Sequence, residues 1–122
     1  MENLIPIEML ARQVIIIDDE KDFCQLLENY FLKKKYKVEV YYLLNEGLKA
    51  LEKHSSGILF LDNNLPDGLG WQKFAELREI YPGLKLHLLS GYNYIRTAIP
   101  GNDHVKYWHK PINFTDLDEY FT

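Results

Sequence analysis

Val-Ile-Ile-Ile-Asp-Asp, residues 14–19, is the stretch that decides the fold, because four apolar residues in succession end abruptly in two aspartates. An apolar run without polar alternation is typical of a strand that is buried on both faces of a parallel sheet. The same arrangement returns in Ile-Leu-Phe-Leu-Asp, residues 58–62. Two such strands predict a sheet that is covered on both sides and carries carboxylates where its strands end.

Segments of helical periodicity alternate with these strand-like runs. Phe23, Leu26, Leu27, Tyr30 and Phe31 fall at positions i, i+3, i+4, i+7 and i+8, which is one face of an amphipathic helix. Three lysines follow at 33–35, and cations are favourable at a helix C-terminus because they complement its dipole. The stretch after the first strand is therefore expected to form a helix that packs on the sheet.

Further elements are expected in the same alternating order. Asn45 is expected to cap a helix that carries Leu48, Ala50 and Leu51 and ends near His54. Strands are expected at 37–41, 84–89 and 105–109, and helices over 71–81 and from 115 to the C-terminus. This alternation predicts a doubly wound α/β domain with a parallel sheet and helices on both faces.

Length and composition limit the organisation of the chain. A chain of 122 residues has room for a single domain, with a core at 13–122 and a leader or linker at 1–12. Within 92–104, Pro100 and Gly101 would stop a helix, so the fourth helix of the pattern is expected to be short or disrupted.

Charge and hydropathy exclude several classes of function. The formal net charge is −4, so no general basic field attracts the chain to nucleic acid or to a membrane surface. No apolar run approaches the roughly 18 residues of a membrane span. The single cysteine, Cys24, cannot form an internal disulfide and fits a reducing, cytoplasmic location.

Polar residues that could carry chemistry stand where four of the five strands end. They are Asp18 and Asp19, then Asp62, Ser90 and Lys110. Ligands of open parallel sheets bind beyond the carboxyl ends of the strands, so these side chains are expected to converge. Three neighbouring carboxylates repel one another unless a cation is present, and Mg²⁺ fits best because it prefers oxygen ligands and keeps open positions for a phosphoryl group.

Each remaining group has a role in phosphoryl chemistry. Lys110 offers a compact positive charge to a phosphate oxygen, and Ser90 offers a hydroxyl donor. A carboxylate can act as a nucleophile and form an acyl phosphate. Asp62 is the natural candidate, because it ends the central strand ahead of a glycine-rich loop.

These motifs, in this order, resemble the receiver domain of two-component response regulators. The matching stretches are Asp-Asp-Glu at 18–20, Asp-Asn-Asn-Leu-Pro-Asp-Gly-Leu-Gly at 62–70, Ser-Gly at 90–91 and Tyr-Trp-His-Lys-Pro at 107–111. The resemblance extends from about residue 13 to residue 120. It implies a flavodoxin-like (βα)5 fold with strand order 2-1-3-4-5.

The resemblance also implies a function and a partner. Asp62 would accept a phosphoryl group from a histidine kinase, a phosphotransfer protein or a small phosphodonor. Asp19 and Asp62 would ligate Mg²⁺ directly, Asn64 would add its backbone carbonyl, and Asp18 would act mainly through water. The domain would catalyse its own phosphorylation and dephosphorylation without turning over a separate substrate.

The switch residues follow from the same resemblance. Ser90 would hydrogen-bond the phosphoryl group and Lys110 would pair with it, while Tyr107 would turn inward as Ser90 moves. The peptide bond before Pro111 is expected to be cis. The output would lie in another protein or in a domain outside this chain, and the resemblance is also compatible with a homodimer.

Two alternatives to this interpretation stay open at this point. The first is a degenerate receiver that keeps the fold and acts as a constitutive protein-interaction module. The interrupted fourth helix suggests it, and the interval of 20 residues between Ser90 and Lys110 is shorter than is usual in the family. The second is a phosphatase like the haloacid dehalogenases, which also use an aspartate after a parallel strand. Those enzymes need a second aspartate as acid and base where this chain has Asn64, and an amide cannot move a proton.

Overall fold

The computed structural model describes residues 12–53, 57–91 and 105–121. Five parallel strands form one sheet in the order β2-β1-β3-β6-β7. They are β1 (Gln13–Ile17), β2 (Lys37–Tyr41), β3 (Ile58–Asp62), β6 (Lys85–Ser90) and β7 (Val105–His109). This order confirms the predicted 2-1-3-4-5 arrangement, and β3 lies at its centre.

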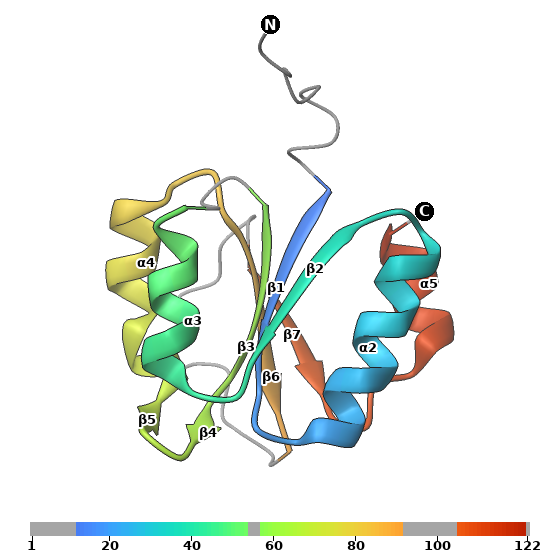
Figure 1. Cartoon of the computed structure of the whole chain (residues 1–122), viewed down its shortest axis with the longest axis horizontal. Helices are drawn as coiled ribbons and strands as arrows, with labels where there is room; N and C mark the ends of the chain where they lie inside the picture. The colour runs from blue at the N-terminus through green and yellow to red at the C-terminus, as the bar shows by residue number, and fades with distance from the viewer. Residues whose placement is uncertain (1–11, 54–56, 92–104, 122) are drawn as a thin grey trace, which may run out of the picture.

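Helices cover both faces of the sheet, as predicted (Figure 1). Helices α2 (Lys21–Lys33) and α5 (Phe114–Phe121) lie on one face, and α3 (Leu44–Leu51) and α4 (Phe74–Ile80) lie on the other. A short hairpin of β4 (Asn64–Leu65) and β5 (Gly68–Leu69) follows β3 and leads through the 3₁₀ helix η1 (Gly70–Lys73) into α4. The chain therefore leaves the central strand through a compact, structured loop.

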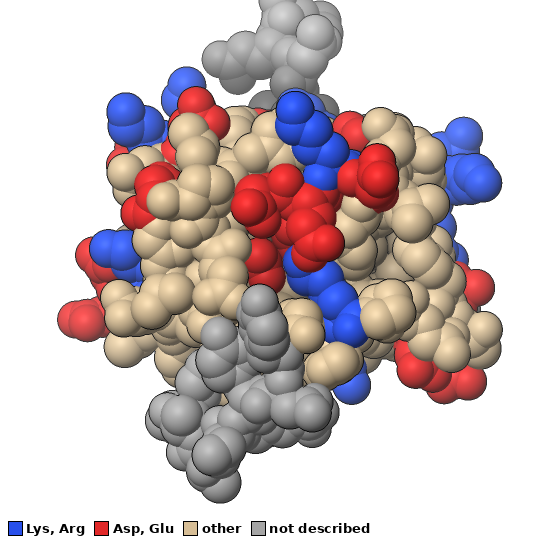
Figure 2. Space-filling model, turned by 90° about the horizontal axis from the view of Figure 1, so that it is seen from below, with Lys and Arg blue, Asp and Glu red and all other residues tan. Residues whose placement is uncertain are grey.

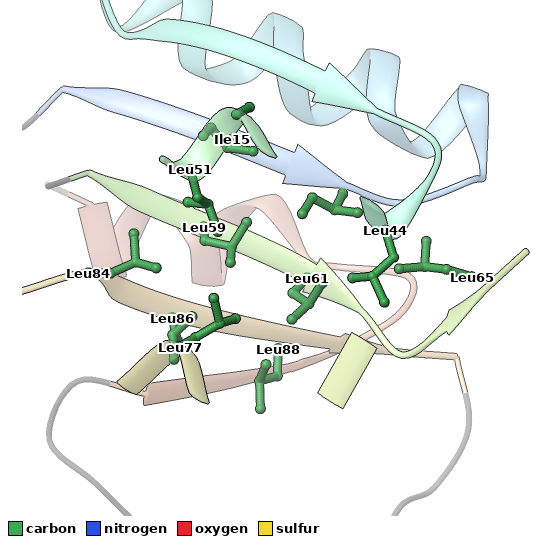
Figure 3. Close-up of a cluster of buried hydrophobic side chains, with 12 residues drawn as sticks. Ile15, Leu44, Leu51, Leu59, Leu61, Leu65, Leu77, Leu84, Leu86 and Leu88 are labelled. Atoms are coloured by element: carbon green, nitrogen blue, oxygen red, sulfur yellow. The ribbon is translucent and has the colours of Figure 1, made fainter. Parts of the chain in front are cut away.

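The continuous apolar runs exist because each central strand supplies two cores. Ile15 and Ile17 pack on the side of α3 and α4, and Val14 and Ile16 pack on the side of α2 and α5. Figure 3 shows the first of these cores, in which leucines from β3, β6, α3 and α4 meet. Successive side chains of a strand point to opposite faces, so a strand with helices on both sides needs an apolar residue at every position.

The expectation that Asn45 caps the helix after β2 is wrong. Helix α3 begins at Leu44, with Leu43 in the N-cap position and without a side-chain cap of its own. Asp67, which lies in the turn of the β4–β5 hairpin, caps the helix instead. Its Oδ1 accepts the N–H of Leu44 at 2.7 Å, and its Oδ2 accepts the N–H of Asn45 at 2.9 Å. Two N–H groups at the start of the helix are thus hydrogen-bonded by a residue more than 20 positions away in the sequence.

The expected apolar face of α2 is narrower than its periodicity indicated. Cys24, Leu27 and Phe31 are buried, whereas the Leu26 side chain is 57% exposed. A helix that packs on a sheet buries one stripe, and Leu26 lies beside this stripe rather than in it. The thiol of Cys24 is buried, and burial raises its pKa to about 12, so the thiolate that would make it reactive is disfavoured.

Some expectations fall outside the described residues. They concern the leader or linker at 1–12, of which only Arg12 is described, and the fourth helix within 92–104. The second helix, expected to end near His54, ends earlier, at Leu51, and a turn follows it at 52–53. Within the described ranges, the helices are all too short to cross a lipid bilayer.

Candidate functional site

The carboxylates of Asp18, Asp19 and Asp62 meet at the carboxyl edge of the sheet. Asp62 ends β3, and Asp18 and Asp19 follow the neighbouring strand β1, whose Ile17 is paired with Leu61. One ligand oxygen from each of the three aspartates lies within 4.8 Å of the other two. Figure 2 looks onto this edge and shows carboxylates gathered at its centre beside basic side chains. The predicted convergence of the three aspartates is therefore confirmed.

Lys110 enters this cluster from the end of β7. Its ammonium nitrogen lies 2.7 Å from Asp18 Oδ2, 2.5 Å from Glu20 Oε1 and 3.6 Å from Asp62 Oδ1. The same nitrogen stands 4.9 Å from the centre of the Phe23 ring, within the range of a cation–π contact. The lysine side chain is only 9% exposed, so its charge is held inside the site by the acidic groups around it.

Burial and charge shift the protonation of the site residues. The pKa of Asp62 is raised to about 7 by burial and, next, by the negative charge of Asp18. Burial also raises the pKa of Asp18, although Lys110 and the N–H of Glu20 oppose this change. Burial on its own lowers the pKa of Lys110, but the hydrogen bonds to Asp18 and Glu20 outweigh it and the pKa is raised. The cluster is thus short of positive charge.

This set of donors fits a hard divalent cation. Carboxylate oxygens are the ligands that Mg²⁺ and Ca²⁺ take in proteins, and an added cation would relieve the repulsion that raises the pKa of Asp62. Asp19 is exposed whereas Asp18 and Asp62 are buried. The acidic cluster is therefore open to solvent on the side of Asp19.

The loop after Asp62 holds the end of β3 by close backbone contacts. The N–H of Gly70 donates to the carbonyl of Asn63 at 2.8 Å, and the N–H of Trp71 donates to the side-chain oxygen of Asn63 at 3.1 Å. A Cβ atom on Gly70 would lie 2.2 Å from the carbonyl oxygen of Asp62. Glycine is therefore required here because the two backbones approach too closely for any side chain.

Ser90, Tyr107 and the peptide bond before Pro111 lie where the sequence predicts. Ser90 is buried at the end of β6, and its carbonyl accepts the N–H of Lys110 at 2.7 Å. The ring of the half-buried Tyr107 packs edge-on against Trp71, with 5.9 Å between the ring centres. The bond between Lys110 and Pro111 is cis, as expected. Serine and lysine are thus joined through the backbone at the site.

A family model described as the response regulator receiver domain matches residues 14–122. The chain belongs to this family. A receiver domain is a phosphorylation-dependent signalling switch rather than an enzyme that turns over a separate substrate. The phosphatase alternative is therefore excluded.

Curated relatives of this receiver domain are transcriptional and other regulators. The chain is 25% identical over 108 residues to the photosynthetic apparatus regulatory protein RegA of Rhodobacter capsulatus, covering 87% of this chain and 59% of RegA. It is 26% identical over 108 residues to the transcriptional regulatory protein PcoR of Escherichia coli, covering 87% of this chain and 48% of PcoR. The receiver domain thus spans about half the length of the curated relatives that it matches.

Solved structures share the fold of this receiver domain. A CheY-like receiver domain protein from Methanospirillum hungatei is 25% identical, with a TM-score of 0.76 and coverage of 89% of each chain. The response regulator TrrA from Thermotoga maritima, solved in complex with Mg²⁺ and a beryllium fluoride, is 24% identical, with a TM-score of 0.76 and coverage of 89% of this chain and 95% of TrrA.

A third neighbour carries a modified aspartate. It is a response regulator from Burkholderia pseudomallei, described with a phosphorylated aspartic acid, a calcium ion and citrate, and it is 24% identical with a TM-score of 0.75. The match covers 90% of this chain and 66% of that one. Related structures therefore contain divalent cations, and the acidic cluster of this domain has the donors to hold one.

Two residues of the site region received no role from the sequence. Glu20 pairs with Lys110, and Asp67 ties the hairpin after β3 to helix α3. Both lie inside the motifs at 18–20 and 62–70. An acidic residue within a motif is the signal that could have pointed to them, but their partners lie 90 and more than 20 positions away.

Proposed function

We propose that Asp62 is the phosphoacceptor of this receiver domain and that a histidine kinase or a phosphotransfer protein supplies the phosphoryl group. The observation that carries this proposal is the position of its carboxylate. Asp62 ends the central strand, one of its oxygens belongs to the acidic cluster with Asp18 and Asp19, and another contact places it 3.6 Å from the Lys110 ammonium. No other residue of the cluster combines the end of β3 with these neighbours.

The chemistry is a transfer to a carboxylate oxygen. An oxygen of Asp62 forms the new O–P bond while the bond between phosphorus and the donor's leaving group breaks, and the leaving group departs with the electron pair of that bond. The transfer brings additional negative charge to the acidic edge. Lys110 is placed to balance a phosphoryl oxygen, and Ser90 supplies a hydroxyl at the neighbouring strand end.

The carboxylates of Asp19 and Asp62 and the backbone carbonyl of Asn64 would hold Mg²⁺ directly, and Asp18 would act through water. When bound, Mg²⁺ supplies positive charge that lowers the repulsion between the aspartates and the incoming phosphoryl oxygens. Asp19 belongs to the acidic cluster and is exposed, which supports its direct contact with a cation that enters from solvent.

Ser90 and Tyr107 would transmit the change at Asp62. They stand on the adjacent strands β6 and β7, where Leu88 pairs with Tyr107 and Ser90 pairs with His109. A movement of Ser90 toward the phosphoryl group therefore changes the end of a strand whose neighbour carries the Tyr107 ring. The half-buried position of this ring against Trp71 supports a choice between two packings.

The proposal includes a partner for the output and a compartment. The effector would be another protein or a domain outside this chain, and a homodimer would be one way to present it. A cytoplasmic location is supported by the buried, reduced thiol of Cys24, which fits a reducing compartment. The acidic net charge supports no direct contact with nucleic acid or membrane.

Incubation with Mg²⁺ and a small acyl phosphate, followed by intact mass measurement, tests the acceptor. A base-labile phosphoryl adduct is expected on the wild type and is expected to be lost in Asp62→Asn. An undiminished adduct on this variant would contradict the assignment. The amide NMR spectrum around Tyr107, recorded with and without beryllofluoride, separates a switch from a degenerate receiver, because a constitutive module would show an unchanged spectrum.

A further inference from the structure

The ammonium group of Lys110 is engaged by two carboxylates that are not the proposed phosphoacceptor. It lies 2.7 Å from Asp18 and 2.5 Å from Glu20, but 3.6 Å from Asp62. The last distance exceeds that of a hydrogen bond. The lysine that is needed at a phosphoryl group on Asp62 is thus committed elsewhere while Asp62 is unmodified.

Capping of its own helix does not account for the direction of the Glu20 side chain. Glu20 is the N-cap residue of α2, yet its carboxylate makes no capping hydrogen bond to the helix. Its backbone N–H donates to Asp18 Oδ1 at 2.8 Å, and its carbonyl accepts the N–H of Cys24 at 3.0 Å. These two bonds fix the backbone of Glu20 beside the acidic cluster and leave its carboxylate free to reach Lys110.

Of the two partners, Glu20 is the one that can release Lys110 at low cost. The Asp18 side chain is fully buried, whereas the Glu20 side chain is 63% exposed. Separating a buried charge from its partner leaves it without compensation. An exposed carboxylate is rehydrated when it lets go, so an ion pair of this kind contributes little and breaks readily.

We propose that Glu20 is a positioning residue that restrains Lys110 in the unmodified receiver and releases it to a phosphoryl group on Asp62. The restraint weakens the hold on the phosphoryl group, because the Lys110–Glu20 pair must break before the lysine can serve its new partner. This inference rests on the proposed function of Asp62. It assigns to Glu20 a control over how strongly the modified state is favoured.

Titration with beryllofluoride in Mg²⁺, which mimics a phosphoryl group, tests the restraint on the full chain. Glu20→Gln is compared with Asp22→Asn, because each variant removes one carboxylate at the start of α2. Within the described residues, the carboxylates paired with Lys110 are those of Asp18, Glu20 and Asp62, so Asp22 controls for general charge. Glu20→Gln is expected to bind the mimic about two- to fivefold more tightly than Asp22→Asn does.

The carboxyl carbon resonance of Glu20 gives a second, direct measurement. In the wild type, this resonance is expected to move toward that of an exposed glutamate as the mimic binds, while the resonance of Asp22 stays in place. Both results together would support the release of Lys110. A role limited to charge at the helix N-terminus would instead change thermal stability in both variants and leave their affinities for the mimic equal.

Four results would overturn the proposal or its basis. Equal affinities of the two variants, or weaker binding by Glu20→Gln, would overturn the restraint, and so would an unmoved Glu20 resonance. If the wild type itself binds no mimic in Mg²⁺, the proposed function of Asp62 fails and the inference fails with it. Binding by the wild type therefore separates an error about Glu20 from an error about the site.

Discussion

The indole nitrogen of Trp108 donates a hydrogen bond of 2.9 Å to Nδ1 of His87 inside the core between the sheet and α2 and α5. The His87 ring also stacks on Phe60, with 4.6 Å between the ring centres, and the residue is 1% exposed. Because Nδ1 accepts the bond, the ring is neutral with its proton on Nε2. Burial lowers the pKa of His87 from 6.5 to about 3, with smaller contributions from nearby lysines.

His87 is therefore expected to make the fold less stable as the pH falls. Between pH 6.5 and 3, His87 is protonated in the unfolded chain but not in the folded chain. The free energy of unfolding therefore falls by about 1.4 kcal/mol for each pH unit of acidification. Relative to the wild type, His87→Phe should gain about 2 kcal/mol of unfolding free energy between pH 7.5 and pH 5.0. Urea unfolding at the two pH values measures this difference.

A comparison at equal pH isolates His87, because all other titrating groups are shared by the two proteins. His109→Asn provides the control, since it removes an exposed histidine without opening the core. If the difference in unfolding free energy between the wild type and His87→Phe stays constant with pH, His87 is not a buried neutral ring.

Asp62→Asn is expected to stabilise the metal-free protein at high pH. Folding raises the pKa of this carboxyl from 3.8 to about 7, so its contribution to stability is complete below pH 3.8 and is lost as the pH rises through 7. With a chelator present, the unfolding free energy of the variant relative to that of the wild type should rise by about 1–3 kcal/mol between pH 5 and pH 8; this difference is the stability advantage of the variant. Unfolding curves in urea provide the measurement.

Mg²⁺ should reduce this advantage, because a cation that binds only the folded wild type stabilises it. Asp22→Asn, which removes an exposed carboxylate, should show neither the pH trend nor the response to Mg²⁺. An advantage of Asp62→Asn that is independent of both pH and Mg²⁺ would contradict the charge crowding described at the site.

Asp67→Ala is expected to lower the midpoint of thermal unfolding by a few degrees. The substitution removes both oxygens that accept the N–H groups of Leu44 and Asn45, so the start of α3 loses its cap. Asp67→Asn keeps one side-chain oxygen and should fall between the wild type and the alanine variant. Equal midpoints for all three proteins would mean that the cap contributes nothing to stability.

Gly70→Ala is expected to cost about 1–3 kcal/mol of stability and to lower the yield of phosphoryl adduct. The new Cβ would stand 2.2 Å from the carbonyl oxygen of Asp62, and a backbone atom cannot rotate away as a side chain can. Gly83→Ala is the matched control, because a Cβ at Gly83 meets nothing within 4 Å. Urea unfolding measures the stability of both variants, and intact mass measures their yield of phosphoryl adduct. A Gly70→Ala variant with wild-type stability and wild-type adduct yield would refute the close contact.

The strands and the acidic edge could be predicted because their signals are local. The apolar run at 14–17 and the aspartates after it are adjacent in sequence, and the geometry of a parallel sheet alone brings Asp62 beside them. The strand predicted at 105–109 and its lysine at the end were correct for the same reason. Each of these inferences needed only periodicity and the rule that strand ends share an edge.

The contacts that adjust the site could not be predicted, because they join distant parts of the chain. The carboxylate of Glu20 could have capped its own helix, but in the folded domain it pairs with Lys110. The N–H groups at the start of α3 are capped by Asp67 rather than by Asn45, although both residue types suit this role. Periodicity likewise placed Leu26 on the packed face of α2, but it lies beside the buried stripe of Cys24, Leu27 and Phe31 and is exposed.

The central place of β3 limits how Asp62, the proposed phosphoacceptor, can be reached. This strand is hydrogen-bonded on both sides and buried on both faces, so its amides should exchange with solvent only when the whole domain unfolds. Local opening of β3 is therefore not expected to expose an acyl phosphate on Asp62 to water or to a phosphatase. If Asp62 carries the phosphoryl group as proposed, its removal is expected to proceed in the folded domain, from the solvent side of the sheet edge, at a rate that does not follow global stability.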